Sequence, residues 1–327
     1  GPAIKQITQF VQIVTGEVVR EDGSVIGDKL TTIPTYPKDG YEFDHWIRVS
    51  PEKTIEGAGS ALTDEQARPL LNQKDGLYQE TVFKAIFRPQ TNLSYTVEYH
   101  WNGTKIPGVE PDTVGGQTFG DKVTVTPKTI DGYTLIPGQN LEIEIGADNN
   151  NNVLVLNYYK NVKLTANSDK KTYNGKEQSV SGFTGAPNGA DFSEIEVGAK
   201  GTDAGEYPAN FPEKTVGKVD KTEKYIVTEA INGKLEITPK TIKVTVTGNT
   251  DTKVYTGETQ FVEGFTTDAP EGVTVELKTG KEAKAEGQNV ETYYMGLTEE
   301  DFEVESQNYN VELSVNDGKL EITPKTI

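Results

Sequence analysis

An internal repeat constrains the fold of this chain more than any other feature of its sequence. Residues 232–242 (NGKLEITPKTI) return as residues 317–327 (DGKLEITPKTI), with ten of eleven positions identical at an offset of 85 residues. A near-identical stretch at such a spacing is typical of tandem structural units. The sequence ends on the residues that would begin a third copy, so we expect that it comes from a longer array.

A second match lies upstream of the first. Lys171–Phe183 (KTYNGKEQSVSGF) matches Lys253–Phe265 (KVYTGETQFVEGF) at seven of thirteen positions, at an offset of 82 residues. The difference between the two offsets means that the second copy has about three more residues in its middle. We therefore predict two copies of one domain, over residues 161–241 and 242–327.

Both copies have the residue pattern of β-strands. Ile242, Val244 and Val246 alternate with polar residues, which is the period of two expected for a half-buried strand. The Thr-Pro-Lys-Thr segment before Ile242 leaves no room for a flexible linker, and its proline stiffens the chain. The sequence therefore predicts a rigid, end-to-end connection between the copies.

The later part of each copy carries a family resemblance. Tyr294–Phe302 (YMGLTEEDF), Asn308–Val311 (NYNV) and Asp317–Pro324 (DGKLEITP) resemble the MBG-type repeat of bacterial surface proteins. The first copy departs from this pattern, since Tyr207–Phe211 (YPANF) stands where the second copy has Tyr293–Leu297. The resemblance implies an array on a cell surface and brings no catalytic residues with it.

Residues 90–160 are predicted to form a separate small β domain. Aromatic and aliphatic residues alternate with polar ones over Tyr95–Trp101, and the following Asn-Gly pair favours a tight hairpin. With Gly115–Asp121, Asp131–Tyr133 and Val153–Tyr159, this strand resembles the mucin-binding-protein repeat of Gram-positive adhesins. The resemblance implies a β-grasp-like α+β module, which in some relatives binds mucin glycans.

Residues 1–89 resemble a third kind of surface-protein repeat. Pro34–Trp46 (PTYPKDGYEFDHW) and Thr81–Phe87 (TVFKAIF) are similar to the internalin B-type (Listeria–Bacteroides) repeat, although His45 stands where that family usually has Gly. Between them, Thr63 and the two acidic residues after it predict a helix start, because a hydroxyl cap and early carboxylates stabilise that end of a helix. One helix on a small sheet again gives a β-grasp-like α+β unit.

The composition excludes several classes of chemistry. None of the 327 residues is Cys and only two are His, so thiolate catalysis, disulfide bonds, cysteine-type zinc sites and three-His metal sites are excluded. Fifty acidic residues against 32 Lys and Arg give a net charge of −18, which argues against binding nucleic acid. No apolar stretch approaches the roughly 20 residues of a membrane span. We expect no cofactor, no bound metal, no membrane insertion in this fragment and a monomeric chain.

Acidic residues give only weak signals for a site. Asp148–Asn152 (DNNNN) lacks the Gly and the distant Glu of a Ca²⁺ loop, so it predicts an irregular turn. Glu142 and Glu144, like Glu303 and Glu305, lie about 7 Å apart along one strand face, close to a glycosidase separation. Alternating acidic residues are common on exposed strands, and we predict no enzyme. A Lys–Asn isopeptide bond would need a buried Lys, an Asn and a carboxylic acid together.

The two histidines and two tryptophans have structural interpretations. Strict alternation places His45 on one face with Phe43, which predicts a partly buried packing role, whereas His100 falls on the polar side of its strand. Trp46 and Trp101 are predicted to pack in a core or at a sheet edge, with a sugar platform as the alternative.

Five aromatic residues of residues 90–160 are the candidate ligand contacts. Aromatic faces stack on sugars, and the few cations of this segment favour neutral glycans over sulfated or sialylated ones. The alternative is that the rings fill the core of a small domain. The five residues are Tyr95, Tyr99, Trp101, Tyr158 and Tyr159.

Together these patterns predict a mainly β chain with minor α structure: an elongated array of four small domains over residues 1–89, 90–160, 161–241 and 242–327. The predicted function is a non-enzymatic segment of a bacterial cell-surface adhesin, extracellular and attached to the cell wall in the full-length protein. It would form a rigid stalk whose candidate partners are host mucin glycans or extracellular matrix. The alternative is a set of carbohydrate-binding accessory modules from a large secreted glycosidase.

Overall fold

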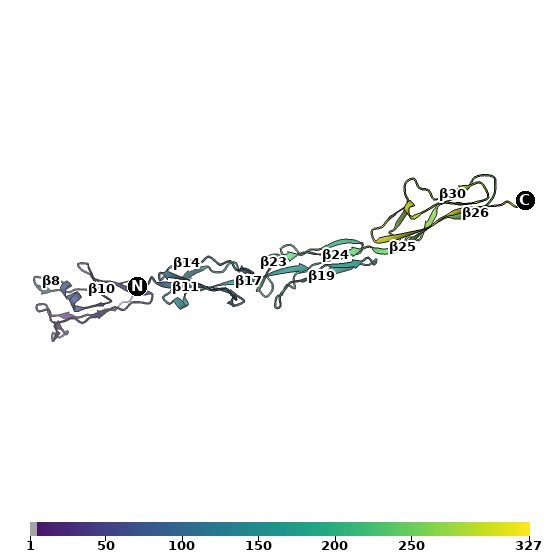
Figure 1. The fold of residues 1–327 in the computed structure, drawn as a ribbon. Coiled ribbons are helices and arrows are strands. Elements are labelled where there is room, and N and C mark those ends of the chain that lie inside the picture. Colours follow the sequence, from purple (N-terminus) through teal and green to yellow (C-terminus); the bar gives the residue numbers. More distant parts are fainter. Residues whose placement is uncertain (1–4) are drawn as a thin grey trace. The chain divides into compact units, whose positions relative to one another are not determined.

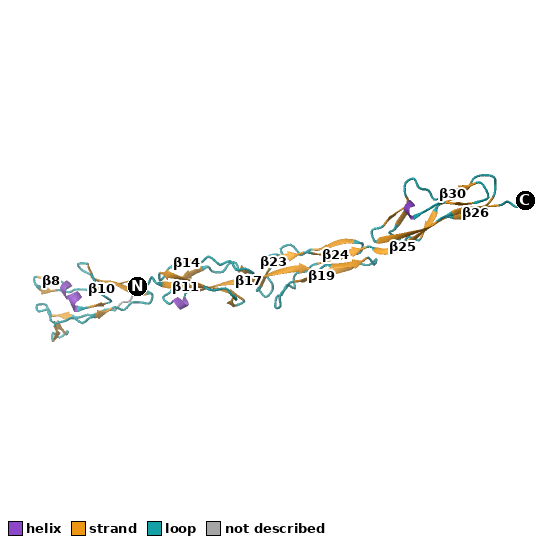
Figure 2. Ribbon diagram, viewed as in Figure 1, coloured by secondary structure: helices purple, strands orange, loops and turns teal. Residues whose placement is uncertain are grey.

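The computed structural model describes residues 5–327, and strands and loops make up nearly all of them (Figure 2). The chain divides into two compact units, residues 1–160 and residues 161–327, which are described separately (Figure 1). Within the described residues the helical segments are one α-helix and three single 3-10 turns: α1 (Asp64–Ala67), η1 (Arg68–Leu70), η2 (Asn149–Asn151) and η3 (Glu299–Asp301). The prediction of a mainly β chain with minor α structure is confirmed, and the finer four-domain division stays a prediction.

Residues 5–89 form a small antiparallel sheet with short strand pairs around it. The strands are β1 (Phe10–Val11), β2 (Val18–Val19), β3 (Val25–Gly27), β4 (Ile33–Pro34), β5 (Tyr41–Arg48), β6 (Lys53–Ile55), β7 (Ala61–Leu62), β8 (Gln73–Lys74), β9 (Leu77–Tyr78) and β10 (Phe83–Pro89). The main sheet has the order β10-β5-β6, so β5 is its centre. Both of its pairings are antiparallel.

The helix α1 begins where the sequence predicts it. The backbone N–H of Thr63 donates to Oε1 of Gln66 at 3.0 Å, which fixes the first turn. Ala67 is buried with Trp46 in the core of this part of the chain. The helix lasts only one turn, because the ring of Pro69 removes a backbone donor.

The predicted face of His45 is wrong, because β5 contains a bulge. Opposite β10, the register shifts between Phe43 and His45, so strict alternation fails at Asp44. Phe43 therefore packs with Trp46, at 6.1 Å between ring centroids, and Trp46 is 4% exposed, which confirms that it packs in a core. His45 instead pairs with Asp44, its Nδ1 lying 2.8 Å from Oδ2.

Residues 90–160 are organised around two parallel strands. The strands are β11 (Leu93–Trp101), β12 (Thr104–Lys105), β13 (Asp112–Gln117), β14 (Lys122–Thr124), β15 (Tyr133–Leu135), β16 (Glu142–Glu144) and β17 (Val153–Ala166). Strand β11 pairs in parallel with the first part of β17, and β12, β13 and β15 extend this sheet. The predicted alternation is confirmed: Tyr95, Val97 and Tyr99 are buried and their neighbours are not.

The α+β prediction for residues 90–160 is not met. Their regular structure consists of strands and the single turn η2, all within the described part of the chain. The segment before β17 contains Gly120, Pro127, Pro137 and Gly138, and glycine and proline are the poorest helix formers. Two of its strands, β14 and β16, form a second small sheet instead.

The first copy of the repeat uses the end of β17 as its opening strand. Its own strands are β18 (Asp169–Thr172), β19 (Gln178–Ser181), β20 (Phe183–Thr184), β21 (Gly198–Gly201), β22 (Gly205–Ala209), β23 (Tyr225–Ile231) and β24 (Gly233–Thr238). Strands β20 and β23 pair with β17, while β18 pairs in parallel with β24. Leu164, Val227 and Leu235 lie fully buried in this copy.

The second copy repeats this arrangement. Its strands are β25 (Lys240–Gly248), β26 (Thr250–Val254), β27 (Gln260–Glu263), β28 (Phe265–Thr267), β29 (Thr274–Leu277), β30 (Lys284–Gly287), β31 (Thr292–Tyr294), β32 (Phe302–Glu305), β33 (Tyr309–Asn316) and β34 (Lys319–Thr323). The opening strands β25 and β26 pair in parallel with the closing strands β33 and β34. The predicted alternation of Ile242, Val244 and Val246 with polar residues is confirmed on β25.

Residues that are identical in the two copies make the same hydrogen bonds. The Nζ of Lys171 donates to the carbonyl of Ser179 at 2.9 Å, and the Nζ of Lys253 donates to the carbonyl of Phe261 at 2.7 Å. Each lysine therefore fastens the strand that follows its Tyr-x-Gly turn. The matching positions serve the backbone of both copies in the same way.

Candidate functional site

Three of the five predicted ligand contacts are buried in the core of residues 90–160. Tyr95 is 8% exposed, and Tyr99 and Tyr158 are each 3% exposed. The rings of Tyr99 and Tyr158 meet edge to face, with centroids 6.2 Å apart. These three side chains therefore pack against the sheet and are not open to a ligand.

The buried tyrosine hydroxyls are held by a polar network inside this part of the chain. Tyr99 donates to Oδ2 of Asp112 at 2.6 Å, and Lys128 Nζ lies 3.0 Å from the same oxygen. Tyr158 donates to the carbonyl of Lys128 at 2.7 Å. Burial, with the hydrogen bond to Asp112, raises the pKa of Tyr99 far above its ordinary value, while the bonds from Tyr99 and Lys128 lower the pKa of Asp112. The network satisfies both tyrosines within the fold.

Trp101 and Tyr159 are half-buried and lie on opposite faces of the sheet, and Trp101 packs against the core, as predicted. Trp101 is in register with Tyr158, which faces the core, and Tyr159 is the next residue along β17 and points the other way. The Nζ of Lys160 lies 5.3 Å from the centroid of the Trp101 ring. The five predicted residues thus form no single surface.

His100 lies on the outer face of the same sheet, as the alternation predicts. Its Nε2 is 2.9 Å from Oε2 of Glu98, and Lys105 Nζ lies 3.1 Å from the other oxygen of that carboxylate. The hydrogen bonds from Lys105 and His100 lower the pKa of Glu98. This cluster fastens β12 to β11.

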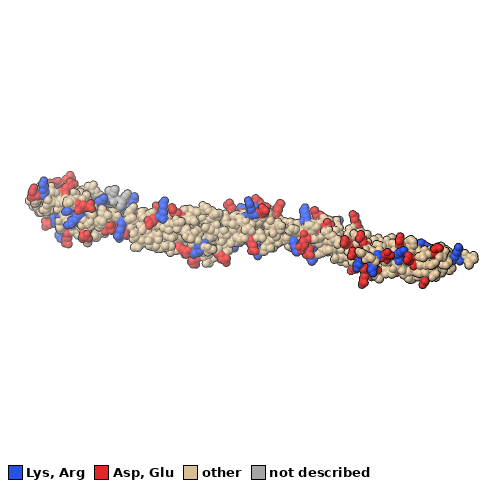
Figure 3. All heavy atoms as spheres, turned by 90° about the horizontal axis from the view of Figure 1, so that it is seen from above, with Lys and Arg blue, Asp and Glu red and all other residues tan. Residues whose placement is uncertain are grey.

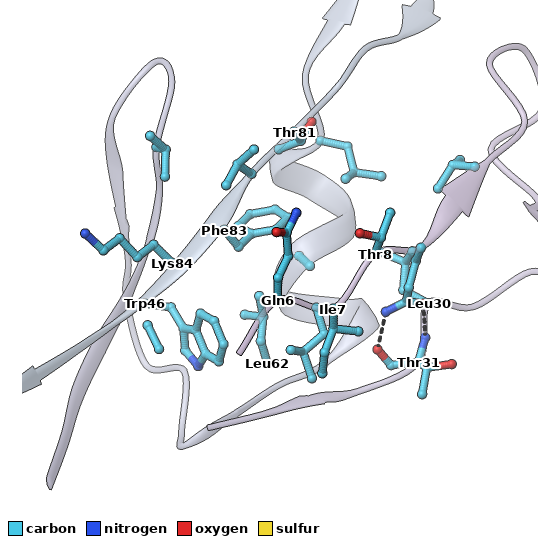
Figure 4. Close-up of a pocket in the computed structure, with 18 of the residues that line it drawn as sticks. Gln6, Ile7, Thr8, Leu30, Thr31, Trp46, Leu62, Thr81, Phe83 and Lys84 are labelled. Atoms are coloured by element: carbon cyan, nitrogen blue, oxygen red, sulfur yellow. Dashed lines mark hydrogen bonds between the residues drawn. The ribbon is translucent and has the colours of Figure 1, made fainter. Parts of the chain in front are cut away.

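A cavity lies within residues 5–87, and the sequence did not predict it. It has a volume of about 620 Å³, within the range of ligand pockets, and we call it the N-terminal pocket. Figure 4 shows Gln6 and Ile7 among Trp46, Leu62 and Phe83 in this pocket. Its walls are mainly aliphatic and aromatic, with a rim of threonines, glutamines and lysines.

Gln9, which lines the N-terminal pocket, pairs its side-chain amide with the backbone of Thr31. The amide of Gln9 both donates to the carbonyl of Thr31 and accepts from its N–H, each at 2.8 Å. A sequence signal for this region existed in the apolar residues at positions 7, 10, 11, 13 and 14. Ile7, Phe10 and Ile13 are each at least 40% exposed, which is unusual for apolar side chains so close in sequence.

A set of contacts, which we call the joint, connects the two copies within residues 161–327. Asn308 of the second copy accepts from the backbone N–H of Ala204 at 2.7 Å and donates to Asp203 at 3.0 Å. Gln307 donates to the carbonyl of Ala204 at 3.1 Å. These bonds join a turn of the second copy to a loop of the first copy more than 100 residues away.

Aromatic packing and a short connection complete the joint. The rings of Tyr173 and Tyr309, one from each copy, meet edge to face at 5.4 Å between centroids. Between β24 and β25 only Pro239 intervenes, and the N–H of Lys240 donates to the carbonyl of Asn308 at 2.9 Å. The short backbone connection and the side-chain contacts therefore both join the first copy to the second copy.

The asparagine-rich segment forms a turn, as predicted. Asp148 accepts from the N–H of Asn150 at 2.9 Å, which caps η2. Asn152, only 3% exposed, donates to the carbonyls of Ser94 and Gly146. These amides fasten the turn to the start of β11.

Acidic and basic side chains are interspersed over the face seen in Figure 3. Among the described residues, no group of three or more His, Cys, Asp or Glu is arranged to hold a metal ion. Their buried polar side chains are Asn152, Thr215 and Asp220, so no lysine is buried as an isopeptide bond would require. No helix of the described chain is long and apolar enough to cross a membrane.

We expect millimolar Ca²⁺ to change the melting temperature of residues 161–327 by less than about 5 °C. A ligand raises the melting temperature by mass action only where it binds the folded state specifically, and we expect no specific Ca²⁺ site here. Thermal unfolding followed by circular dichroism, with and without Ca²⁺, measures this shift, and Mg²⁺ at equal ionic strength is the control. A larger shift that saturates with Ca²⁺ concentration would contradict the expectation that this part of the chain binds no metal.

Comparison with known proteins gives no family. No family model matches the sequence, and no curated protein matches it. Among solved structures, the Bacillus anthracis TIE protein has a TM-score of 0.25 and 10% identity, covering 90% of this chain and 68% of its own. The N-terminal four Ig domains of Dscam1 isoform 9.44 have a TM-score of 0.19 and 10% identity, covering 91% and 99%. Both TM-scores lie below 0.5, so the description of the chain as mainly β, with several small sheets, rests on its own strands.

Proposed function

We propose that this chain is a non-enzymatic, load-carrying segment of a bacterial cell-surface adhesin. The observation that supports this most directly is the joint, in which Asn308 and Tyr309 of one copy contact a loop and a tyrosine of the other. A flexible tether would need none of these contacts. A module built to hold its neighbour at a fixed angle suits a stalk that keeps a binding part away from the cell wall.

The adhesive part of the proposal belongs to residues 5–160. Half-buried Tyr159 remains on the outer face of the sheet, and the N-terminal pocket offers a cavity of about 620 Å³. Host mucin glycans or matrix proteins are the proposed partners. A glycan and mucin array probed separately with residues 1–160 and 161–327 tests this assignment, and binding confined to residues 161–327 would overturn it.

We expect the joint to restrict motion between the two copies. The chain has no Cys, so spin labels can be placed at Ser193→Cys and Glu271→Cys, both exposed positions, one in each copy. Asn308→Ala removes two hydrogen bonds, so it should weaken the interaction between the two copies by about 1–2 kcal/mol. The distribution of distances between the labels should therefore become broader. Pulsed electron paramagnetic resonance measures that distribution.

The matched control for this experiment is Asn310→Ala, which removes an exposed asparagine on β33, two residues after Asn308. This variant should leave the distribution as narrow as in the parent chain. Equally broad distributions in the parent chain and in Asn308→Ala would mean that the joint does not hold the copies together, and the stalk proposal would lose its main support.

We expect the whole chain to be extended in solution. A domain of about 80 residues has a diameter near 30 Å, so four domains end to end should span about 120 Å or more. Small-angle X-ray scattering measures this maximum dimension. A value below about 80 Å would exclude four domains of that size placed end to end.

A further inference from the structure

Three parts of this chain pair an opening strand with a closing strand in the same way. In residues 90–160, β11 runs parallel to β17 over Thr96–Trp101. In the first copy β18, which follows the end of β17, runs parallel to β24, and in the second copy the equivalent strand β26 runs parallel to β34. A parallel pair of opening and closing strands is therefore a recurring element of this molecule.

Residues 5–89 have the two strand-length segments of such a pair but not the pairing. Their closing strand, β10, has β5 on one side and lies at the edge of the described sheet on the other. The opening segment, Lys5–Val11, lies outside any strand except at its last two residues, Phe10 and Val11, which form β1 with β2. Both segments are seven residues long, so one could cover the length of the other.

The N-terminal pocket lies between these two segments. Its lining includes residues 5–11 from the opening segment and residues 81–85, which are the start of β10 and the two residues before it. Trp46 and Leu62 of the core also line it. Figure 4 shows Gln6 and Ile7 near Phe83, and all three residues line the pocket. Ile7 lines this apolar space and is still 40% exposed.

We propose that the free edge of β10 and the N-terminal pocket together form an acceptor site for a strand, and that its occupant is this chain's own segment Lys5–Val11. In the docked state the segment runs parallel to β10, completes the sheet and places Ile7 in the pocket. An edge strand is a template for pairing, and burial of an exposed isoleucine favours the docked state. The pocket is then open only when this segment is released.

Disulfide trapping in the full chain tests the proposed docking. Thr8→Cys is combined in turn with Lys84→Cys, Ile86→Cys and Arg88→Cys, which cover three registers along β10. Neighbouring strands bring Cα atoms within the roughly 4.4–6.8 Å that a disulfide requires. We expect one of these pairs to oxidise within the chain at least about tenfold faster than the control pair Thr8→Cys with Lys53→Cys, which places the second thiol on the opposite edge strand β6.

The outcomes of trapping separate the possible occupants. Oxidation no faster than in the control pair overturns the proposal. A disulfide that forms mainly between two chains also overturns it, because the site would then accept the segment of a second copy. Mass spectrometry of the non-reduced protein distinguishes the two kinds of cross-link.

Hydrogen exchange provides a measurement that needs no engineered thiol. We expect the amides of β10 to exchange about as slowly as those of β5, and Ile7→Asp to accelerate β10 at least about tenfold by releasing the segment. The amides of β11 are the internal control and should not change. If β10 exchanges at the same rate in the parent chain and in Ile7→Asp, the segment does not dock on it.

Discussion

Replacing Asp220 by alanine should lower the free energy of unfolding of the first copy by about 3 kcal/mol or more, because it leaves several buried N–H groups without an acceptor. Asp220 is 3% exposed, and its carboxylate accepts hydrogen bonds from backbone N–H groups and from Thr222. One oxygen accepts from the N–H groups of Lys224 and Tyr225, each at 3.0 Å, and the other accepts from Asp191 at 2.9 Å and from Thr222. One carboxylate thus holds together the loops that precede β23.

The positions of the two tryptophans allow the unfolding of the two units to be followed separately. Both tryptophans, Trp46 and Trp101, lie in residues 1–160, so tryptophan fluorescence follows that unit alone. Circular dichroism of the full chain should show that Asp220→Ala begins to unfold at a lower urea concentration than the parent chain. The midpoint of the transition followed by tryptophan fluorescence should not change. Glu213→Ala, which removes one exposed negative charge from the same copy, is the matched control. A midpoint unchanged from this control would contradict the assigned role.

The effect of Asp220 should also depend on pH. Burial alone raises the pKa of this carboxyl group, but the hydrogen bonds from Thr222 and from the backbone of Asp191, Tyr225 and Lys224 outweigh it, so its pKa in the fold lies below the ordinary 3.8. A depressed pKa stabilises the fold above the unfolded-state value, and the contribution is lost as pH falls through the folded-state value. The difference in free energy of unfolding between the parent chain and Asp220→Ala should therefore be largest at neutral pH and should decrease below about pH 4.

Alanine at the glycine of the repeated Gly-Lys-Leu-Glu-Ile-Thr-Pro motif should destabilise either copy by about 2–3 kcal/mol, because an added methyl group would collide with backbone. A Cβ on Gly318 would lie 2.5 Å from the carbonyl oxygen of Asn249, and a Cβ on Gly233 would overlap the carbonyl oxygen of Asn167. Backbone atoms cannot turn aside as a flexible side chain can. Denaturation followed by circular dichroism measures the loss for Gly233→Ala and Gly318→Ala.

Gly115→Ala is the control for this pair. A Cβ at Gly115 meets nothing within 4 Å, so its substitution should change stability by less than about 1 kcal/mol. Losses of similar size at Gly115 and Gly233 would mean that the glycine effect is general and not a result of close backbone approach.

Local patterns in the sequence predicted local structure well. The alternation over Tyr95–Trp101 placed its buried residues correctly, and Thr63 begins the helix, because both features depend on residues close together in the chain. The face of His45 was wrong because a bulge inserts one residue at Asp44, and nothing in the apolar pattern marks such an insertion. A prediction from strict alternation fails wherever a β-bulge adds one residue to a strand relative to its partner.

The candidate sites could be predicted much less well, because they depend on residues that are distant in the sequence. Asn308 gains its role from a loop 104 residues earlier, and Asp220 from a donor 29 residues away. Burial of Tyr95 and Tyr99 followed the predicted alternation, yet their aromatic character alone suggested ligand contacts. The core alternative considered for these residues accounts for their observed positions.

The parallel pairing of opening and closing strands has a mechanical consequence. In the second copy, Lys240–Thr247 of β25 lies beside Tyr309–Asn316 of β33, and β26 lies beside β34 in the same sense. A force that pulls the start of β25 away from the end of β34 acts along these strands, so it shears many hydrogen bonds at once instead of opening them one by one. Rupture in that geometry requires the whole ladder to slip together, which is the property a tether needs when flow pulls on an attached cell.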